Sequence, residues 1–413
     1  MRQETKMNNN RKIINDPVFG FINIPDGFIY EIICHPYLQR LSRIKQLGFA
    51  SLVYPGAQHT RFHHSLGAMY LMGEAISQLR SKGNEITEEE AEAVLACILL
   101  HDIGHGPFSH VLESTLVSGI CHEQISLMLM DRINRSFNGK LDVTIAIFKN
   151  EYPKKFLHQL VSGQLDMDRL DYLCRDSFFT GVVEGNIGSA RIIKMLNVKD
   201  DRLVVEAKGI YSTENFLMAR RLMYWQVYLH KTSVAAEKML INTLNRAEFL
   251  VQQGVDLSAS PSLSYFLQNH VNQSVFRNNP EALDHFIDLD DNDIWCALKL
   301  WSKHSDKVLS ILSDGLINRN LFKIEIKTEP FENSILKDKI QHYAKQLGIT
   351  ETEAGYFVSS DEISTNMYNE ADDSIDILFK NGETKDIAEA SDMLNIQLLS
   401  KKVKKYYLCN LKW

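Results

Sequence analysis

The chain of 413 residues contains few cysteines and no close pair of them. Its six cysteines are widely scattered without a CxxC pair, so we predict that they are buried free thiols. An apolar leader is also absent, because residues 1–12 are polar, and no uncharged stretch is as long as a membrane span. These absences predict a cytoplasmic protein that does not contact a membrane.

The sequence has no excess of basic residues. Its 45 Lys+Arg residues stand against 52 Asp+Glu residues, for a formal net charge of -7. Proteins that coat nucleic acid bind phosphates through clusters of cations, so this balance argues against that class. The lysine-rich run at 401–405 is the main support for nucleic-acid binding, but such a run is more often a solvated face. We therefore do not favour nucleic acid as a partner, whereas a nucleotide pocket needs only a few local cations.

Internal repeats and long low-complexity segments are absent as well, and 45% hydrophobic residues can build a large core. The apolar periodicity is mostly helical, whereas residues 322–327 alternate with period two. Residues 375–379, which precede the hairpin-type dipeptide Asn381-Gly382, and residues 405–411 are further predicted strands. We predict a mainly α fold with a polar tail at 1–13, a helical core at 14–240, a helical extension at 241–323 and a small mixed α/β C-terminal lobe at 324–413.

Four predicted helices carry the polar residues of most interest. A capping box at Thr87–Glu90 begins a helix whose apolar run ends at His101. A second helix is predicted from about His64 to Ala75, after a Tyr-Pro-Gly turn. The last two cover residues 166–175 and, as one long helix, residues 213–241.

These helices can bring two imidazoles and two carboxylates together. A lone histidine or aspartate more often caps a helix than binds a metal. A His-Asp doublet directly after a buried helix is different, because burying a charge without a partner is costly. Mixed nitrogen and oxygen ligands without thiolate suit one divalent ion, and Fe, Mn, Ni, Zn and Mg all stay open. The predicted ligands are His64, His101, Asp102 and Asp168.

An ordered series of motifs surrounds these four residues. The series resembles the HD-domain phosphohydrolases, named for their His-Asp doublet, and within them the deoxynucleoside triphosphate triphosphohydrolases. One doublet alone would be weak support, whereas the ordered series over about residues 14–323 is specific. Its strings are Gln39–Leu41, Ile44–Gly48, Tyr54–Ala57, Arg61–Gly67, His101–His110, Asp166–Tyr172, Tyr228–Lys231 and, more weakly, Arg319–Lys323.

The resemblance implies an HD-domain catalytic core at 14–240, the four metal ligands and a set of substrate contacts. Arg61 and Arg169 would hold phosphate oxygens through their guanidinium groups. Tyr172 would pack against the deoxyribose, where little space would remain for a 2′-hydroxyl. The other implied contacts are Gln46 and Asp176 near the 3′-hydroxyl, and Arg220 and Tyr228 around phosphate and base. Each has a structural alternative as a core aromatic, a surface charge or a helix cap.

The implied reaction converts a deoxynucleoside triphosphate to a deoxynucleoside and inorganic triphosphate, through attack of water at the α-phosphorus. Because the 5′-oxygen leaves as a poor alkoxide, an acid should protonate it. His110 is the predicted acid, and Glu113, three residues further along the helix, would orient its ring. His105 and His122 are further candidates for phosphate contact or proton relay.

The regulatory positions of the family are only partly matched. Cys34 and Ser42 stand where vertebrate members have an aspartate and an arginine that help to bind an activating guanine nucleotide, which argues against that activation here. Arg319 and Lys323 match positions near the regulatory nucleotides. The resemblance also implies a homo-oligomer, from a dimer to a tetramer or hexamer.

Two other functions fit the same residues. One is an HD phosphohydrolase that acts on another nucleotide, such as a monophosphate, a cyclic nucleotide or an alarmone, because a fold does not fix a substrate. The other is a non-catalytic module that binds nucleotide or nucleic acid and uses the metal structurally. A structural site needs no histidines beyond its ligands, which favours an enzyme.

Overall fold

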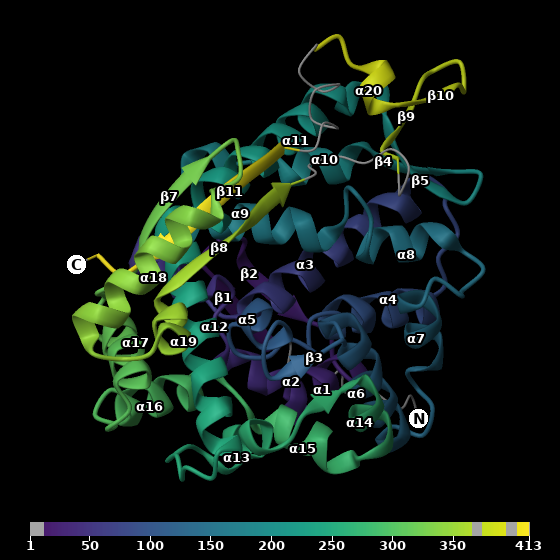
Figure 1. The fold of residues 1–413 in the computed structure, drawn as a ribbon. Helices are drawn as coiled ribbons and strands as arrows, with labels where there is room; N and C mark the ends of the chain where they lie inside the picture. Colours follow the sequence, from purple (N-terminus) through teal and green to yellow (C-terminus); the bar gives the residue numbers. More distant parts are fainter. Residues whose placement is uncertain (1–11, 366–373, 394–402, 413) are drawn as a thin grey trace.

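The computed structural model describes residues 12–365, 374–393 and 403–412 of the chain, and they form a helical body with small sheets (Figure 1). The prediction of a mainly α fold is therefore confirmed. The helices of the first half are α1 (Phe28–Cys34), α2 (Pro36–Arg40), α3 (Arg61–Ser81), α4 (Glu88–Leu100), α5 (Ser109–Glu113), α6 (His122–Ser136), α7 (Asp142–Phe148), α8 (Lys155–Val161) and α9 (Met167–Thr180).

The second half of the chain is also mainly helical. Its helices are α10 (Ser189–Met195), α11 (Ile210–Met223), α12 (Lys231–Gln252), α13 (Pro261–Gln268), α14 (Gln273–Asn278), α15 (Pro280–Asp288), α16 (Asp291–Trp301), α17 (Lys307–Ile317), α18 (Asn333–Leu347), α19 (Glu351–Ala354) and α20 (Ile387–Ala390). Among the described residues, no helix combines the length and the apolar character needed to cross a bilayer.

Helix α4 lies at the centre of the core and packs against α3. Thr87 Oγ1 accepts the Glu90 N–H at 3.1 Å, and Glu90 Oε2 accepts the Thr87 N–H at 2.8 Å, so the predicted capping box is confirmed. From Ala96 to Leu100 the helix is fully buried. Because α4 ends at Leu100, the backbone carries His101 directly out of the apolar core.

Helix α9 crosses α3 at a glycine. A Cβ atom on Gly67 would lie 2.0 Å from Asp171 Oδ1 and 2.1 Å from Arg175 Nη2. The missing side chain therefore makes room for a buried ion pair of α9 against α3. This close approach brings the first turns of the two helices, with His64 and Asp168, to the same place.

The long helix predicted over residues 213–241 is wrong, because the chain breaks there. Helix α11 ends at Met223 and continues as one π-helical turn, η5 (Tyr224–Tyr228). His230 is extended, and its Nδ1 accepts the Thr232 N–H at 3.2 Å as the cap of α12. Single π-turns within helices often mark functional sites, and this one carries Tyr228.

The predicted strands are confirmed, in two sheets. An antiparallel sheet has the order β7 (Lys323–Lys327), β11 (Val403–Asn410) and β8 (Val358–Thr365). In the second sheet, β10 (Thr384–Asp386) and β9 (Asp376–Leu378) form the predicted hairpin, and β9 pairs parallel with β5 (Arg202–Glu206), next to β4 (Leu196–Lys199). Residues 324–413, predicted as one lobe, thus contribute to two sheets on different sides of the body (Figure 1).

Two short pairings complete the fold. An antiparallel pair joins β1 (Lys12–Asp16) to β2 (Gly20–Ile24), so a strand begins inside the stretch predicted as a tail. A parallel pair joins β3 (Val117–Ser118) to β6 (Val271–Asn272). The cysteines are free, as predicted, but the prediction that they are buried is wrong for Cys34 and Cys296, which are exposed.

Candidate metal centre

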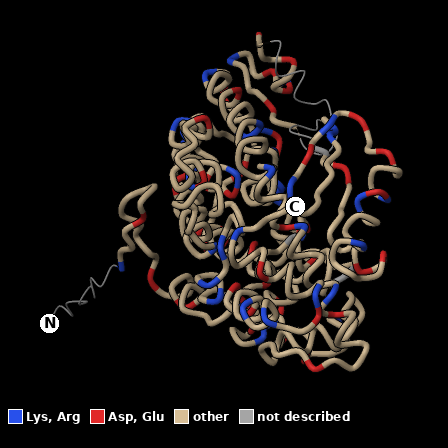
Figure 2. Tube along the Cα trace, turned by 60° about the vertical axis from the view of Figure 1, so that its left-hand side comes forward, with Lys and Arg blue, Asp and Glu red and all other residues tan. Residues whose placement is uncertain are grey.

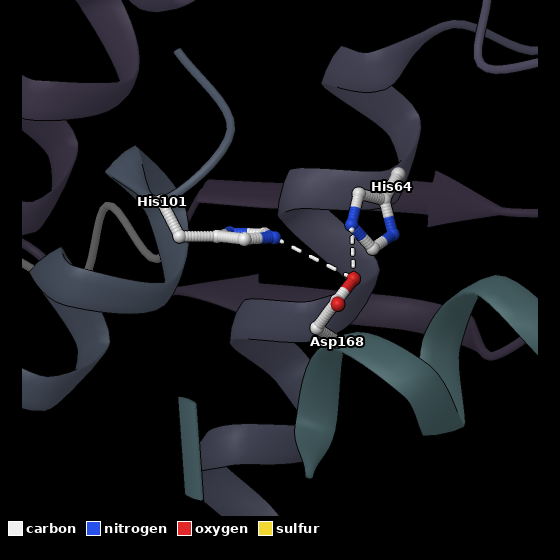
Figure 3. A group of neighbouring side chains, drawn as sticks. All are labelled: His64, His101 and Asp168. Atoms are coloured by element: carbon white, nitrogen blue, oxygen red, sulfur yellow. Dashed lines mark ion pairs between the residues drawn. The ribbon is translucent and has the colours of Figure 1, made fainter. Parts of the chain in front are cut away.

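Three of the predicted ligands, His64, His101 and Asp168, come from three segments and meet in one place (Figure 3), and the fourth, Asp102, lies beside them. His64 lies in the first turn of α3, His101 follows α4, and Asp168 lies in the first turn of α9. Asp168 Oδ1 is 3.0 Å from His64 Nε2 and 3.5 Å from His101 Nε2. Asp102 Oδ1 is 3.4 Å from His101 Nε2, and Asp102 Oδ2 is 3.8 Å from His64 Nε2. The structure therefore brings all four together.

Two observations indicate that this group fits a divalent ion. Nε2 of both histidines is buried and has no hydrogen-bond partner of adequate geometry among the described residues. Ligands that share one ion at about 2.1 Å and at right angles lie about 3 Å apart, close to the two distances from Asp168 Oδ1. Imidazole nitrogens and carboxylate oxygens suit Fe, Mn, Ni, Zn or Mg equally, so the geometry does not choose among these ions.

Hydrogen bonds at the other ring nitrogens fix how the two histidines face the centre. His64 Nδ1 is 2.7 Å from Asp171 Oδ2, and His101 Nδ1 is 2.7 Å from the carbonyl oxygen of Ile98. Because a carboxylate and a carbonyl accept, each ring donates its Nδ1 proton and turns the Nε2 lone pair toward the centre. Such contacts orient metal-binding histidines and raise their basicity.

Asp171 belongs to a buried network that the sequence analysis missed. Arg175 donates to both Asp171 oxygens at 2.9 Å and to Asp16 Oδ2 at 2.7 Å. All three side chains are buried. The spacing contained a signal, because Asp171 follows Asp168 by three residues and precedes Arg175 by four, the separations at which helix side chains meet.

Carboxylates outweigh cations at the centre, and the pKa values reflect this. Burial alone lowers the pKa of His64, but Asp168 and Asp171 raise it to about 10. At His101, burial also lowers the pKa, but the charges of Asp102 and Asp168 raise it by more, so its pKa is raised. The carboxylates therefore draw positive charge into the centre. Since a histidine must be deprotonated to bind a metal, a divalent ion would take the place of these protons.

A second group of predicted residues lies beside Asp102. His105 Nε2 is 3.2 Å from Asp102 Oδ1, and the His105 ring stacks on His122 with centroids 3.9 Å apart. His122 Nδ1 is 2.9 Å from Glu113 Oε1. Burial, followed by the charge of Arg61, lowers the pKa of His105 well below its usual value, which keeps this ring neutral. The predicted residues His105, His122 and Glu113 thus form a chain that begins at Asp102.

The side chain of the predicted acid, His110, lies outside the described residues, although its backbone lies in α5. Glu113, predicted to orient His110, is in contact with His122. The structure therefore adds a partner of Glu113 that the sequence analysis did not foresee. The pairing of Glu113 with His110 stays a prediction.

The arginines predicted to contact phosphate lie near the centre and use part of their donor capacity within the protein. Arg61 Nη1 donates to Asp102 Oδ2 at 2.6 Å. The turn at 163–166 holds the other two, because Arg169 Nε donates to a carbonyl oxygen there at 2.6 Å and Arg220 Nη1 donates to an amide oxygen at 3.0 Å. Nε of Arg61 and of Arg220 is buried without a partner among the described residues.

The residues predicted to contact the sugar and base form a second group, in which Asp176 is buried and Gln46, Tyr172 and Tyr228 are half-buried. The Tyr228 hydroxyl donates to Asp176 Oδ2 at 2.7 Å, and the rings of Tyr172 and Tyr228 meet edge to face at 6.1 Å. Gln46 Oε1 is buried without a partner among the described residues. His59 lies in this group with Nε2 at 2.8 Å from Asp176 Oδ1. Sequence analysis missed His59, because a single buried histidine has no spacing pattern.

The predicted regulatory positions lie at the surface and near it. Arg319 Nη2 donates to the last carbonyl of the 48–52 turn at 3.0 Å, and Lys323 pairs at 3.3 Å with a carboxylate of its own strand. Cys34 and Ser42 are both exposed. The expectations about an effector therefore stay predictions.

Comparisons of sequence and structure show which known proteins this chain resembles. The family described as HD domain matches residues 61–175, and the HD associated region matches residues 187–257. The uncharacterized protein YwfO of Bacillus subtilis is 31% identical over 92% of this chain and 88% of its own length. The deoxynucleoside triphosphate triphosphohydrolase SAMHD1 of Bos taurus is 26% identical over 81% of this chain, which covers 62% of that enzyme. The crystal structure of a phosphohydrolase from Bacteroides thetaiotaomicron is 70% identical, with a TM-score of 0.95 over 97% of this chain and 100% of that one.

Proposed function

Because this chain belongs to the HD-domain phosphohydrolases related to deoxynucleoside triphosphate triphosphohydrolases, we propose that it hydrolyses deoxynucleoside triphosphates to deoxynucleoside and inorganic triphosphate. The observation that carries this proposal is the shared position of His64, His101, Asp102 and Asp168, where two buried imidazole nitrogens lack a hydrogen bond of adequate geometry among the described residues. Arginines next to these ligands support a polyphosphate rather than an uncharged ester as the substrate.

His64, His101, Asp102 and Asp168 would hold one divalent ion, and the rest of the chemistry belongs to the protein. When bound, the ion would polarise an α-phosphate oxygen and orient water for attack. Arg61 sits against Asp102 and can reach a phosphate oxygen through its unpartnered Nε. A fixed guanidinium close to the ligands would orient the α-phosphate and stabilise the charge that develops on it.

Arg169 and Arg220 would bind the remaining phosphates. Both are tied to the turn at 163–166, which limits the rotamers that they can adopt. Guanidinium groups that are held in place lose less conformational entropy when they bind a phosphate. This supports a substrate with a polyphosphate chain of fixed path.

Bond cleavage needs a proton at the leaving 5′-oxygen. Water supplies the oxygen that bonds to the α-phosphorus, the bond from that phosphorus to the 5′-oxygen breaks, and an acid protonates the 5′-oxygen. His110 is our candidate for this acid. His122, which pairs with Glu113, and His105 would relay the proton that the attacking water loses back to the acid.

Identification of the phosphate product tests the proposal. Purified protein would be incubated with each deoxynucleoside triphosphate and with Mg, Mn, Fe, Ni or Zn, and the products separated by anion exchange. We expect tripolyphosphate and deoxynucleoside in equal amounts. Release of orthophosphate or pyrophosphate would instead assign another HD phosphohydrolase reaction.

We extend the proposal to a homo-oligomer. Large apolar side chains that are exposed in the single chain support it, among them Phe21 at 72%, Val183 at 77% and Tyr211 at 70% exposure. Light scattering coupled to size-exclusion chromatography measures the mass, which would be a multiple of 47.3 kDa.

A further inference from the structure

His59 is a fully enclosed histidine in the segment before α3 that none of the proposed steps uses. Its side chain is completely buried, and its ring stacks on Phe179 with centroids 4.5 Å apart and planes 19° apart. The approach of the Gly56 backbone fixes this wall, because a Cβ on Gly56 would lie 2.6 Å from the Phe179 carbonyl oxygen. The ring of His59 therefore has little freedom to rotate.

The ring edge of His59 holds Asp176. Nε2 lies 2.8 Å from Asp176 Oδ1, and a carboxylate accepts, so the ring donates. The other oxygen, Oδ2, accepts from Tyr228 at 2.7 Å. Burial and then Asp176 raise the pKa of Tyr228 well above its usual value, so this phenol keeps its proton and stays a donor. With one donor on each oxygen, the plane of the Asp176 carboxylate is fixed.

The backbone of His59 holds Gln46. The Gln46 N–H donates to the His59 carbonyl oxygen at 3.1 Å. Gln46 Oε1 is buried without a partner among the described residues, which is an acceptor that lacks its donor. Asp176 also keeps free lone pairs, since each carboxylate oxygen can accept more than one hydrogen bond. His59 thus positions two acceptors, and either of them can accept the one hydrogen bond that a hydroxyl group donates.

We propose that His59 is a positioning residue that sets Asp176, beside Gln46, at the right place to accept the one hydrogen bond that the 3′-hydroxyl of a bound nucleotide donates. The inference rests on the proposed function and deepens it, because it names what makes the site select a sugar that carries this hydroxyl. Buried acceptors left without a donor penalise an analogue that lacks the hydroxyl far more than a simple loss of contact area would.

Two variants separate the effect of the hydrogen-bond donor of His59 from the effect of its ring shape. His59→Phe keeps a ring against Phe179 and removes the donor to Asp176, whereas His59→Gln offers an amide N–H in its place. Kinetic constants would be measured for wild type and both variants, with each deoxynucleoside triphosphate and its 2′,3′-dideoxy analogue. Thermal unfolding and metal content of each variant show whether the fold and the metal centre are intact.

The wild type should prefer the 3′-hydroxyl substrates, and H59F should lose that preference. In H59F we expect kcat/KM for the deoxynucleotide to fall about tenfold or more, mainly through KM, while kcat/KM for the dideoxy analogue changes less than about twofold. H59Q should recover most of the preference. Metal content should stay that of the wild type in both variants.

The possible failures are distinguishable. The role proposed for His59 is wrong if H59F lowers kcat/KM for both substrates by the same factor or changes neither value. It is also wrong if the wild type has the same kcat/KM for both sugars. In each of these cases the proposed hydrolysis stands. A wild type that releases no tripolyphosphate from any deoxynucleoside triphosphate overturns the proposed function and this inference with it.

Discussion

His64 and His101 each turn Nε2 toward the candidate metal centre because Nδ1 is engaged in a hydrogen bond within the protein. Asp171 and the Ile98 carbonyl accept hydrogen bonds from the two Nδ1 atoms, each with an N···O distance of 2.7 Å, so both rings are oriented before any ion binds. The two partners differ in kind. A backbone carbonyl cannot be changed by substitution, whereas Asp171 is a side chain whose contribution can be measured.

Replacing Asp171 by asparagine should weaken metal binding. Asp171→Asn removes the negative charge that stabilises the donated His64 proton, and loss of such a contact typically lowers metal affinity about 10- to 100-fold. Competition with a metal-binding dye would measure the affinity. Asp16→Asn is the matched control, because Asp16 accepts from the same Arg175 at 2.7 Å, whereas the described carboxylates that pair with His64 are Asp102, Asp168 and Asp171. Equal affinities in the two variants would contradict the role of Asp171.

Asp291 is predicted to make stability depend on pH. It is buried with Oδ1 unpartnered among the described residues, and burial raises its pKa from 3.8 to about 6. The folded state then holds its proton more tightly than the unfolded state, so stability falls as pH rises from about 4 to 6. Asp291→Asn should therefore be more stable than wild type at pH 7.5 by up to about 3 kcal/mol, with a much smaller difference at pH 4.

Urea unfolding in the presence of a chelator measures the stability difference between D291N and wild type without a contribution from bound metal. Asp288→Asn, at an exposed position of α15, controls for the loss of one negative charge. A stability difference between D291N and wild type that stays constant from pH 4 to 7.5 would show that Asp291 has an ordinary pKa.

At the scale of single residues, the sequence pointed to the candidate ligands but not to the residues that orient them. The four ligands follow from an ordered series of motifs. Asp171 and His59 act on partners 107 and 117 positions away in the chain, so no local pattern contains the contact. The contact of His63 is different because it is local. His63 Nδ1 accepts the Thr60 N–H at 3.2 Å, three residues away at the start of α3.

Among the helices, α3 offers a direct test of how the site is assembled. Gly67→Ala places a methyl group on the buried Asp171–Arg175 pair, at 2.0 and 2.1 Å, so these charges must separate or the helices must move apart. We expect a loss of about 2 kcal/mol or more in the free energy of unfolding. Gly73→Ala lies in the same helix and meets nothing within 4 Å, so it should gain up to about 1 kcal/mol.

Denaturant unfolding of the two variants measures both effects side by side. A G67A protein as stable as G73A would mean that α3 and α9 do not pack as described. The comparison holds helix propensity constant, because both substitutions replace a helical glycine by alanine in one helix.

Sequence patterns located several elements, but they did not predict the break between α11 and α12. The capping box, the β9–β10 hairpin and the strands β7 and β11 have local signals that the structure confirms. The break at His230 has none, because helical spacing of apolar residues continues through the π-turn at 224–228. Packing against the rest of the molecule decides it.

On the scale of the whole molecule, the C-terminal sheet reaches the helical body at the π-turn η5. Lys405 Nζ of β11 lies 3.8 Å from the ring centroid of Trp225, in the π-turn that also carries Tyr228. Lys404 pairs with Glu362 at 3.1 Å. The described lysines of the 401–405 run are therefore engaged within the protein, and residues 401 and 402 lie outside the described part of the chain.

Charges of both signs are spread over the chain, and Figure 2 shows acidic and basic positions mixed along the trace. This agrees with the net charge of -7 and with a local rather than a global attraction for phosphate.

Neither composition nor periodicity could predict that residues 376–378 pair with the 202–206 strand, because the assembled fold determines which strands far apart in sequence pair with each other.

The most direct test of the account is hydrolysis of a deoxynucleoside triphosphate in water enriched in oxygen-18, with mass spectrometry of both products. If water attacks the α-phosphorus beside His64, His101, Asp102 and Asp168, one labelled oxygen appears in the tripolyphosphate and none in the deoxynucleoside. Label in the deoxynucleoside, or in orthophosphate or pyrophosphate, would contradict the proposed reaction.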